Sequence, residues 1–473
     1  MPQKCDIGII GMAVMGQNLA LNIARKGFSV AVFNRTAEKT RQFFENRVKD
    51  EPIYPAYSLE EFIDLLRSPK KVMLMVKAGK PVESFLELLF PLLEAGDLIL
   101  DGGNSHFQDT ERRIAQAEKK GLLYLGVGIS GGEEGALNGP SIMPGGHRAG
   151  YELVEEILKQ AAAQADGPCT TYLGPGGAGH FVKMVHNGIE YAIMQAIAEC
   201  YDLFRKAYQL KAPQIGQIFD QWNQSPNLQS YLLEISSQVL QYQDQETKTP
   251  LVDLILDQAE QKGTGKWTSQ TAFDLGVPTP TINQSVITRT LSSFSDLRQK
   301  TSNLLKPEEK EGPTYLVGEE GARSLFSQAL FLTELAAFSE GFHLLYQASS
   351  ELNYHLSLPD IARIWQGGCI LQAPLLKRIQ AAFKTDSFPL LFATSQFKQE
   401  VKDNLQALVQ TVTLGAQNNT PLPCLGAALS YYQAWQAETL PTNLIQAQRD
   451  YFGAHTYRRI DREGIFHTIW KEG

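Results

Sequence analysis

The fold of the amino-terminal part is decided by residues 6–36, which read DIGIIGMAVMGQNLALNIARKGFSVAVFNRT. Residues 6–10 predict a strand, residues 17–26 a helix and residues 29–33 a second strand. The turn between the first strand and the helix consists of Gly11, Met12, Ala13, Val14, Met15 and Gly16. Such a turn lets the backbone approach a pyrophosphate, and free N–H groups at the helix start attract its charge. We expect a dinucleotide site at these six residues, although an ordinary strand-to-helix turn can share the pattern.

The end of the second strand indicates which dinucleotide binds. It reads Asn34-Arg35-Thr36, where an NAD enzyme usually carries an acid that binds the ribose 2′-hydroxyl. Without an acid a 2′-phosphate is not repelled, and the guanidinium of Arg35 and the hydroxyl of Thr36 can bind it. The alternative is that Arg35 is simply an exposed surface residue. The pattern favours NADP.

Apolar runs and helical patterns alternate through the first third of the chain. Further strands are predicted at residues 72–76, 98–100 and 122–127, and helices at residues 82–93 and 109–119. The alternation predicts a parallel sheet covered on both faces, with ligands beyond the carboxyl ends of its strands. Three segments with polar and glycine residues fall at those ends, Lys77-Ala78-Gly79, Asp101-Gly102-Gly103-Asn104-Ser105 and Ser130-Gly131-Gly132.

The pattern changes after about residue 179. Long helical patterns dominate there, for example at residues 181–208, 327–349 and 398–417, and strand signals nearly vanish. We therefore predict an α/β Rossmann-type domain at residues 1–178 and a large all-helical domain at residues 179–440. Residues 441–473, with scattered glycine and proline, are predicted to form an extended carboxyl-terminal tail.

The richest segment for chemistry is residues 179–191, GHFVKMVHNGIEY. At roughly 100° per residue, one helical face carries Lys183, His186, Asn187 and Glu190. Lys183 and Glu190 are two turns apart, close enough for their long side chains to converge on one substrate. The alternative is a stabilising polar stripe on a solvated helix.

This face suits the oxidation of a β-hydroxy acid. A base must remove the hydroxyl proton while a hydride leaves, and a lysine with a lowered pKa can do so. The protonated lysine then polarises the new carbonyl while carbon dioxide leaves. Glu190 can protonate the terminal carbon of the remaining enediol, and this route needs no metal.

Composition excludes several classes of protein. The formal net charge of −8 disfavours a nucleic-acid binder, and no apolar run reaches membrane-spanning length. The five cysteines are scattered without a CxxC pair, which favours a reducing compartment and gives no zinc motif. We expect a cytoplasmic protein without a metal.

The chain resembles the decarboxylating 6-phosphogluconate dehydrogenases along essentially its whole length. The resembling blocks occur in order at residues 11–16, 34–36, 77–79, 101–105, 130–135, 143–146, 180–191, 262–268 and 449–455. The resemblance implies the reaction of the oxidative pentose phosphate pathway, in which 6-phospho-D-gluconate and NADP give D-ribulose 5-phosphate, carbon dioxide and NADPH.

The resemblance also implies roles for individual residues. Lys183 is the implied general base and acid, and Glu190 the general acid. Substrate ligands are implied at Asn104, Ser130, Gly131, Gly132, His186, Asn187, Tyr191, Lys262, Thr264, Arg289, Arg449 and His455. The cofactor is implied to contact the first turn, Asn34, Arg35, Thr36, Val76, Lys77, Ala78 and Asn104. Because Arg449 and His455 would come from the partner subunit, a homodimer with exchanged tails is implied.

Some positions depart from the family's pattern. A basic residue is expected near Leu137 or Asn138, a glycine and an acidic residue are commoner than Ala192 and Ile193, and Arg458 stands where an acid is usual. These departures leave every proposed catalytic group in place.

Two other functions are consistent with parts of the sequence. A β-hydroxyacid dehydrogenase that does not decarboxylate, such as one acting on hydroxyisobutyrate, would share the dinucleotide turn and the helical lysine. It would be shorter and would lack residues 262–268 and the tail. A non-catalytic NADPH sensor would tolerate the loss of Lys183 or Glu190, and both are present.

Overall fold

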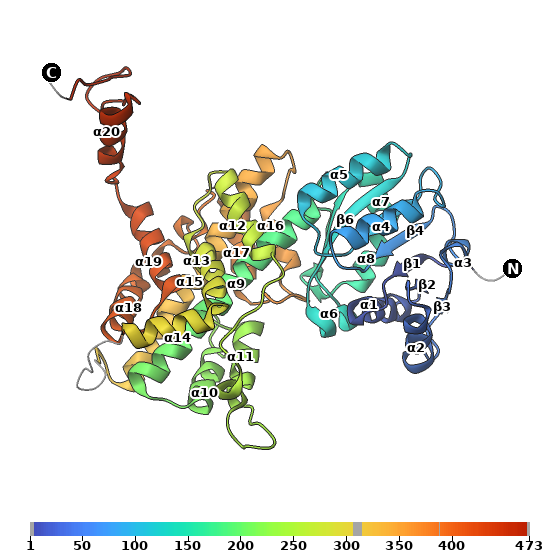
Figure 1. The fold of residues 1–473 in the computed structure, drawn as a ribbon, viewed down its shortest axis with the longest axis horizontal. Coiled ribbons are helices and arrows are strands. Elements are labelled where there is room, and N and C mark those ends of the chain that lie inside the picture. The colour runs from blue at the N-terminus through green and yellow to red at the C-terminus, as the bar shows by residue number, and fades with distance from the viewer. Residues whose placement is uncertain (1–3, 306–314, 387, 471–473) are drawn as a thin grey trace. The chain divides into compact units, whose positions relative to one another are not determined.

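A computed structural model describes residues 4–305, 315–386 and 388–470. The chain forms two compact units, one extending to Ala428 and a smaller one beginning at Leu429. The larger unit contains a sheet and most of the helices (Figure 1).

A seven-stranded sheet organises the first part of the larger unit. Its strands lie in the order β3-β2-β1-β4-β5-β6-β7, and all are parallel except β7, which pairs antiparallel with β6. The strands are β1 (Ile7–Ile10), β2 (Val30–Phe33), β3 (Ile53–Pro55), β4 (Lys71–Leu74), β5 (Leu98–Asp101), β6 (Leu123–Ile129) and β7 (Ile142–Gly146). The sequence predicted all of them but β3 and β7, and the antiparallel edge strand corrects the prediction of a purely parallel sheet. Pro144, Gly145 and Gly146 hide β7, because proline and glycine weaken a strand pattern.

Helices cover both faces of this sheet. On one face Ile7 and Ile9 of β1 share a core with α1 (Val14–Arg25), α2 (Ala37–Arg47) and α8 (Glu155–Ala161). On the other face Ile10 shares a core with α3 (Leu59–Asp64), α4 (Lys80–Leu89) and α5 (Phe107–Glu118). Strands buried on both faces explain why the sequence shows continuous apolar runs rather than alternation.

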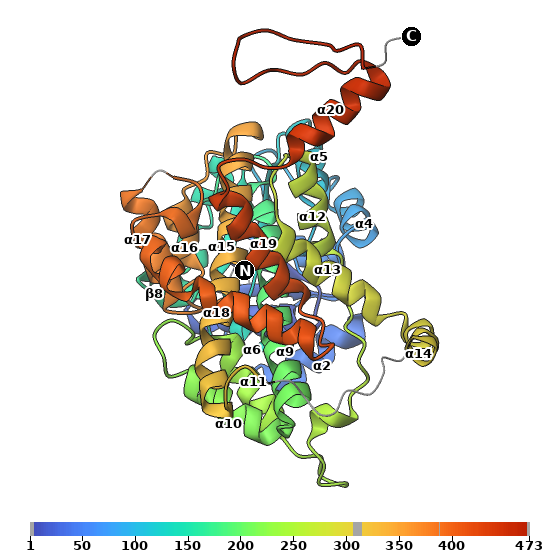
Figure 2. The same cartoon turned by 90° about the vertical axis from the view of Figure 1, so that its left-hand side faces the viewer.

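The helical part of the larger unit is built around two long helices, α9 (Ala178–Tyr208) and α15 (Glu319–Glu351), which pack together. Figures 1 and 2 show the later helices gathered around this pair. They are α10 (Ala212–Trp222), α11 (Tyr231–Gln241), α12 (Thr264–Asp274), α13 (Pro280–Ser292), α14 (Ser295–Leu304), α16 (Leu358–Ile364), α17 (Leu375–Thr385), α18 (Lys398–Gln417) and α19 (Pro423–Gln436), with 3₁₀ turns η1 (Leu251–Leu254) and η2 (Leu391–Ala393). The boundary between the two units falls within α19. Between β6 and α9 lie α6 (Gly132–Asn138), α7 (Arg148–Glu152) and a small hairpin of β8 (Gln164–Ala165) and β9 (Gly167–Pro168).

Glycines let α9 lie directly on the sheet. A Cβ atom on Gly128 of β6 would lie 2.4 Å from the Lys183 Cβ, and one on Gly179 would lie 2.3 Å from the Gly126 carbonyl oxygen. No side chain fits at such distances, so both positions require glycine. Strand β6 therefore places Lys183 beside its own carboxyl end.

The smaller unit contains α20 (Thr442–Gly453) followed by a loop in which Tyr457 and Phe466 pair antiparallel. Residues 442–453 are helical, so the prediction of an extended tail is wrong for them. Their apolar residues gave no helical signal because many face solvent rather than one core, as Leu444 and Phe452 do.

Candidate active site

The first turn is shaped for close approach of a ligand. Gly11 has a φ of +107°, and a Cβ on Gly16 would lie 1.9 Å from the Gly11 carbonyl oxygen, so both positions require glycine. Ala13 has an ordinary φ of −81° at the start of α1 and is exposed. The turn therefore tolerates the methyl group of Ala13, and the start of α1 presents free N–H groups to a phosphate.

Asn34 braces this turn from the end of β2. Its Oδ1 accepts a hydrogen bond from the Met12 N–H at 3.1 Å, and its Nδ2 donates to the Thr36 carbonyl oxygen at 3.1 Å. Arg35 and Thr36 are exposed, and Arg35 forms no ion pair within the described part of the chain. A guanidinium without an acidic partner next to the dinucleotide turn fits a 2′-phosphate.

The loops after β4 and β5 lie at the same edge of the sheet as the first turn, where the parallel strands have their carboxyl ends. Val76 and Ala78 are half-buried beside the exposed Lys77, and Asn104 is exposed between two buried neighbours. The structure therefore leaves Lys77 and Asn104 available to a ligand at the carboxyl ends of the strands.

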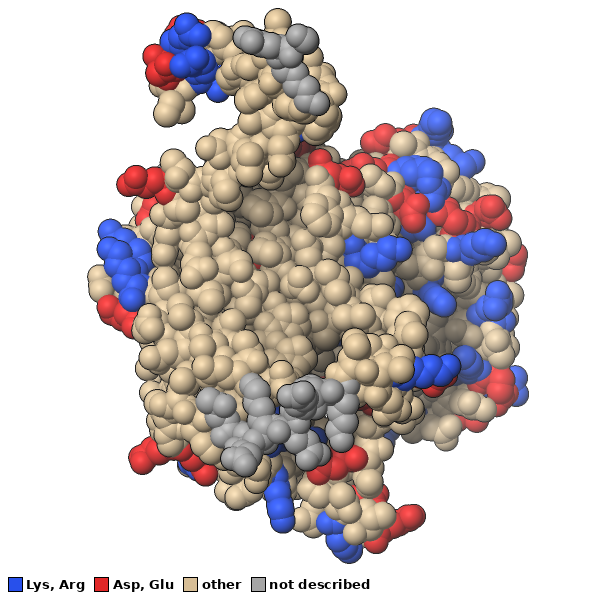
Figure 3. Space-filling view, turned by 60° about the vertical axis from the view of Figure 1, so that its left-hand side comes forward, with Lys and Arg blue, Asp and Glu red and all other residues tan. Residues whose placement is uncertain are grey.

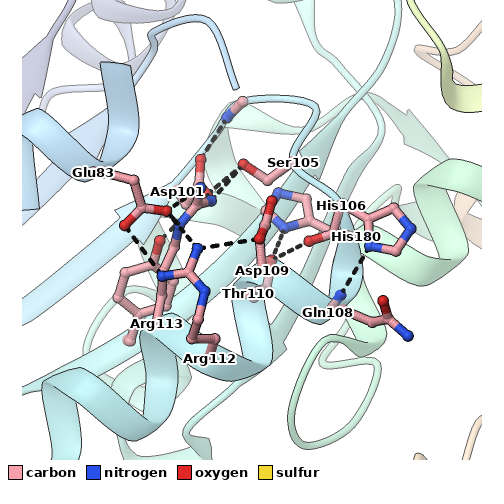
Figure 4. A network of polar contacts seen from close by, with 12 residues as sticks. Glu83, Asp101, Ser105, His106, Gln108, Asp109, Thr110, Arg112, Arg113 and His180 are labelled. Atoms are coloured by element: carbon pink, nitrogen blue, oxygen red, sulfur yellow. Dashed lines mark hydrogen bonds and ion pairs between the residues drawn. The ribbon is translucent and has the colours of Figure 1, made fainter. Parts of the chain in front are cut away.

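A buried polar network holds the loop that carries Asn104 (Figure 4). Asp101, the last residue of β5, accepts hydrogen bonds from the Ser105 hydroxyl at 2.7 Å and the Gly103 N–H at 3.1 Å. The fully buried Arg113 of α5 donates to Asp101 at 2.9 Å and to the Ser105 hydroxyl at 2.8 Å. Both ends of the loop are thus tied to one carboxylate, which fixes Asn104 between them.

The network extends outward to α4. Glu83 accepts hydrogen bonds from Arg113 at 2.9 and 3.0 Å and from Arg112 at 2.6 Å, and Arg112 also donates to Asp109. The charge of the buried Arg113 is therefore balanced by carboxylates on two sides, as a buried cation requires.

The predicted face of α9 forms the centre of the site. Lys183 and His186 are buried, Asn187 is half-buried, and 19% of the Glu190 side chain is exposed. The His186 Nδ1 lies 3.6 Å from a carboxylate oxygen of Glu190. The prediction that these residues lie on one helix is confirmed, since α9 is continuous from Ala178 to Tyr208 and places them on one face.

Burial shifts all three ionisable groups toward their neutral forms. It lowers the pKa of Lys183, against the opposing effect of Glu190, and holds the pKa of His186 well below its ordinary value. It raises the pKa of Glu190, although Lys183 and Arg289 oppose this. A neutral amine can accept a proton and a neutral carboxyl can donate one, so both groups suit acid–base catalysis.

The loop after β6 adjoins this face. The Ser130 hydroxyl lies 3.4 Å from the His186 Nε2. Gly131 and Gly132 have φ values of +104° and +62°, and a Cβ on Gly131 would lie 2.5 Å from the Gly368 carbonyl oxygen. Nothing would lie within 4 Å of a Cβ on Gly132, which leaves its backbone open to a ligand.

Two more helices bring predicted ligands to α9. Asn187 donates to the hydroxyl of Thr264, the first residue of α12, at 3.0 Å. The guanidinium of Arg289 in α13 lies 3.5 Å from the centre of the Tyr191 ring. Lys262, just before α12, is exposed. The structure thus brings Thr264 and Arg289 to the Asn187–Tyr191 side of the face.

Arg449 and His455 lie in the smaller unit, where both are exposed. Their place in the site stays a prediction. Five positions differ from the family's pattern. Ala192 and Ile193 are buried within the helical part, Leu137 is half-buried in α6, and Asn138 and Arg458 are exposed.

Sequence reasoning missed two neighbours of the catalytic face. Buried Trp365 lies edge-on to the His186 ring at 5.3 Å, and the buried thiol of Cys369 interacts electrostatically with Lys183 and Glu190. Burial raises the pKa of Cys369 to about 12, so the thiol is neutral. Neither residue belongs to a spaced motif that could have indicated its position.

The described residues contain no group of three or more His, Cys, Asp or Glu side chains that could hold a metal ion. Among the same residues no helix has the length and apolar character needed to cross a membrane.

Comparison with known proteins places this site in a family. Residues 6–174 match the model of the NAD binding domain of 6-phosphogluconate dehydrogenase, and residues 179–470 match that of the C-terminal domain of 6-phosphogluconate dehydrogenase. The chain is 49% identical to a decarboxylating 6-phosphogluconate dehydrogenase of Synechococcus elongatus over 98% of this chain and 99% of that protein. It is 47% identical to the NADP(+)-dependent, decarboxylating enzyme of Bacillus subtilis, over 99% of both chains.

A solved structure agrees with these sequences. The 6-phosphogluconate dehydrogenase of Plasmodium falciparum, whose structures include complexes with NADP+ and with 6-phosphogluconate, superimposes with a TM-score of 0.94 at 42% identity. The match covers 98% of this chain and 100% of that one. On these grounds the chain belongs to the family of decarboxylating 6-phosphogluconate dehydrogenases.

Proposed function

We propose that this chain oxidises and decarboxylates 6-phospho-D-gluconate to D-ribulose 5-phosphate with NADP, the reaction of the oxidative pentose phosphate pathway. The observation that carries the proposal is the placement of buried Lys183 and half-buried Glu190 on one face of α9, beside the carboxyl end of β6. Family membership supports the same reaction.

The residues present fit NADP. The N–H groups at the start of α1 suit the pyrophosphate, and exposed Arg35 and Thr36 suit the 2′-phosphate. When bound, NADP accepts the hydride released by the substrate. Met12 to Met15, Val76, Lys77, Ala78 and Asn104 complete the proposed contacts.

Lys183 and Glu190 divide the proton transfers. Neutral Lys183 removes the proton of the β-hydroxyl group during oxidation and then, as an ammonium, donates toward the new carbonyl oxygen while carbon dioxide leaves. Lys183, neutral again after this donation, removes the proton of the enediol hydroxyl group while Glu190, as a neutral carboxylic acid, protonates the terminal carbon and gives the ketone. Transfer of that proton from Lys183 to the Glu190 carboxylate through solvent returns both groups to their starting forms.

The remaining ligands orient the sugar acid. Ser130, Gly131, Gly132, His186 and Asn187 would hold the carboxylate and hydroxyl end, next to Lys183. Tyr191, Lys262, Thr264 and Arg289 would hold the phosphate, where two cations and the α12 N-terminus favour negative charge.

We also propose a homodimer in which the tail supplies Arg449 and His455 to the partner's site. The smaller unit is too short to bury a large core and exposes large apolar side chains, among them Phe452, Ile465 and Ile469. Figure 3 shows a broad face of the helical part with few charged side chains, and residues 404–437 contain none. Such surfaces are typical of obligate interfaces between subunits.

The proposed location is the cytoplasm. All five cysteines are free and buried, as in proteins of a reducing compartment.

The test is an absorbance assay for NADPH with 6-phosphogluconate, run beside NAD and beside unphosphorylated gluconate. NADPH and carbon dioxide should form together, fastest with NADP and the phosphorylated acid. NADPH without carbon dioxide would instead favour the non-decarboxylating dehydrogenase, and no NADPH would contradict the proposal.

A further inference from the structure

The smaller unit is organised by the carboxylate of Asp450, which is fully buried in α20. One oxygen accepts hydrogen bonds from the Thr456 N–H and the His467 Nδ1, both at 2.9 Å. The other accepts from the Thr468 N–H at 3.1 Å and the Trp470 Nε1 at 2.8 Å. The carboxylate therefore joins α20 to the turn that follows it and to the last described residues, with its acceptor capacity in use.

Asp450 carries its negative charge at neutral pH. Burial opposes its charge, but hydrogen bonds from His467, Thr468 and Trp470 lower its pKa to about 2. A charged acceptor forms stronger hydrogen bonds than a neutral one, so this junction is stiff.

Gln446 makes a second connection one turn earlier in α20. Its Nε2 donates to the Thr456 carbonyl oxygen at 2.6 Å, and its Oε1 accepts from the Arg449 guanidinium at 3.1 Å. The backbone of Thr456 is thus hydrogen-bonded to Asp450 through its N–H and to Gln446 through its carbonyl oxygen. The side-chain amide of Gln446 also binds the Arg449 guanidinium.

The backbone at this turn needs such support. Ala454 and Thr456 have φ values of +50° and +58°, in the left-handed region that side chains disfavour. A Cβ on Gly453 would lie 2.7 Å from the His455 ring, so glycine is what lets that ring fold back against the end of α20. His455 therefore lies between two residues with strained backbone, Ala454 and Thr456, and Thr456 is held by hydrogen bonds to Gln446 and Asp450.

We propose that Gln446 and Asp450 are positioning residues that hold Arg449 and His455 as one preformed half-site for the phosphate group of the sugar acid. This rests on the proposed function, in which those two residues bind that phosphate in the partner subunit. Preorganisation strengthens binding because the side chains lose less freedom when the anion arrives. The effect should therefore fall on phosphate affinity and leave the chemistry of α9 unchanged.

The experiment compares Gln446→Ala, Asp450→Asn and Arg449→Ala in the full-length enzyme. Two matched controls come from the same unit: Gln448→Ala, an exposed glutamine of the same helix, and Asp461→Asn, which breaks an exposed ion pair with Arg459. For each variant kcat, the KM values for 6-phosphogluconate and NADP, and the inhibition constant of inorganic phosphate are measured. Limited proteolysis of the tail reports whether it stays folded.

We expect Gln446→Ala and Asp450→Asn to raise the KM for 6-phosphogluconate and the inhibition constant of phosphate in parallel, each by about fivefold or more, since a lost hydrogen bond has that effect. The kcat and the KM for NADP should stay within about twofold, as should all constants of the controls.

Three results would overturn the proposal. If Arg449→Ala raises the KM for 6-phosphogluconate and the inhibition constant of phosphate while Gln446→Ala and Asp450→Asn do not, the positioning role is wrong. The role of the tail in binding the phosphate would then stand. If Arg449→Ala changes neither, the tail does not bind the phosphate and both ideas fail. If Asp450→Asn makes the tail protease-sensitive, Gln446→Ala becomes the deciding variant, because it keeps all four hydrogen bonds to Asp450. An unchanged KM for 6-phosphogluconate and an unchanged inhibition constant of phosphate in Gln446→Ala would then contradict the positioning role.

Discussion

Burial acts in opposite directions on the two ionisable groups that the mechanism uses. It lowers the pKa of Lys183 and raises that of Glu190, so each is moved toward the form that carries no charge. The same face holds His186 neutral, which lets it accept or donate a hydrogen bond to substrate without competing for the transferred proton.

Replacing Lys183 tests the base directly. Lys183→Ala should reduce kcat by about 10²–10⁴-fold, the usual contribution of a positioned base, while 6-phosphogluconate still binds. The measurements are NADPH formation and calorimetric binding. Lys206→Ala is the control, since this exposed lysine lies on the same helix and pairs with Asp202. Retained turnover in Lys183→Ala would assign the base to another group.

The pH dependence follows from the same shifts. The proposed mechanism requires neutral Lys183, which is favoured as pH rises, and protonated Glu190, which is favoured as pH falls, so kcat/KM should be bell-shaped. Because burial lowers the pKa of Lys183, activity should develop well below the ordinary lysine value of 10.5. Glu190→Gln should reduce kcat and give a profile that rises with pH and then stays level. A bell-shaped profile that persists in this variant would show that an acid other than Glu190 causes the loss of activity at high pH.

Arg35 tests the choice of cofactor. Arg35→Ala should raise the KM for NADP about tenfold or more and leave the KM for NAD nearly unchanged, because only NADP carries the 2′-phosphate. Arg41→Ala, an exposed arginine of the next helix, controls for loss of surface charge. Equal effects on the two cofactors would mean that Arg35 does not contact the 2′-phosphate.

Among the secondary-structure elements, α9 depends most on how closely it lies to the sheet. Gly128→Ala would place a methyl 2.4 Å from the Lys183 Cβ. Relief requires a shift of α9 or β6, so we expect about 1–3 kcal/mol of destabilisation and a lower kcat.

Urea unfolding and kcat check this prediction, and Gly318→Ala is its control. Gly318 has an ordinary φ of −63° and a Cβ there would meet nothing within 4 Å, so this substitution should cost far less stability and leave kcat unchanged. If both alanine variants behave alike, close packing at Gly128 does not matter.

The elements also show what the sequence could predict. Strands β1, β2, β4, β5 and β6 carry strong apolar runs between turn residues, and α9 carries a clear periodicity, so all were expected close to their observed places. Strand β7 was not, because Pro144, Gly145 and Gly146 have low strand propensity. Gly145 packs closely against Gly179 of α9, and Gly146 against Tyr124 and Leu125 of β6. Helix α20 was not expected either, because many of its apolar side chains face solvent and therefore follow no single buried stripe.

The site was predictable to the extent that it is local in sequence. Lys183, His186, Asn187 and Glu190 follow one helical period, so their convergence could be read directly. The contacts of Asn187 with Thr264 and of Arg289 with Tyr191 join distant segments, and only the resemblance suggested them. The ion pair of Asp101 with Arg113 was not predicted, although residues 101–105 were singled out, since a buried ion pair has no spacing signature.

For the whole molecule, the tail is the part to test. Ending the chain after Pro441 should raise the KM for 6-phosphogluconate about tenfold or more, or abolish activity, because the proposed phosphate ligands Arg449 and His455 are lost. An unaffected truncation would contradict the shared site.

A mixing experiment distinguishes exchange from action within one chain. The truncated chain keeps Lys183 but lacks the tail, and full-length Lys183→Ala has the opposite defect. Mixed dimers should regain activity, because each truncated subunit receives a tail from its partner. Activity that does not recover in confirmed mixed dimers would mean that each tail serves its own subunit.

The junction between sheet and helices in the larger unit uses the main chain itself. The Ser141 N–H donates to the Gly368 carbonyl oxygen at 2.7 Å, and the Ser141 hydroxyl donates to the Ile364 carbonyl oxygen at 2.7 Å. A stretch some 220 residues downstream thus completes the framework of the nucleotide-binding half. Anyone grafting a cofactor domain from another dehydrogenase would need to transplant residues 364–369 with it. Cofactor preference in this enzyme is therefore better altered by point changes around Arg35 than by exchanging modules.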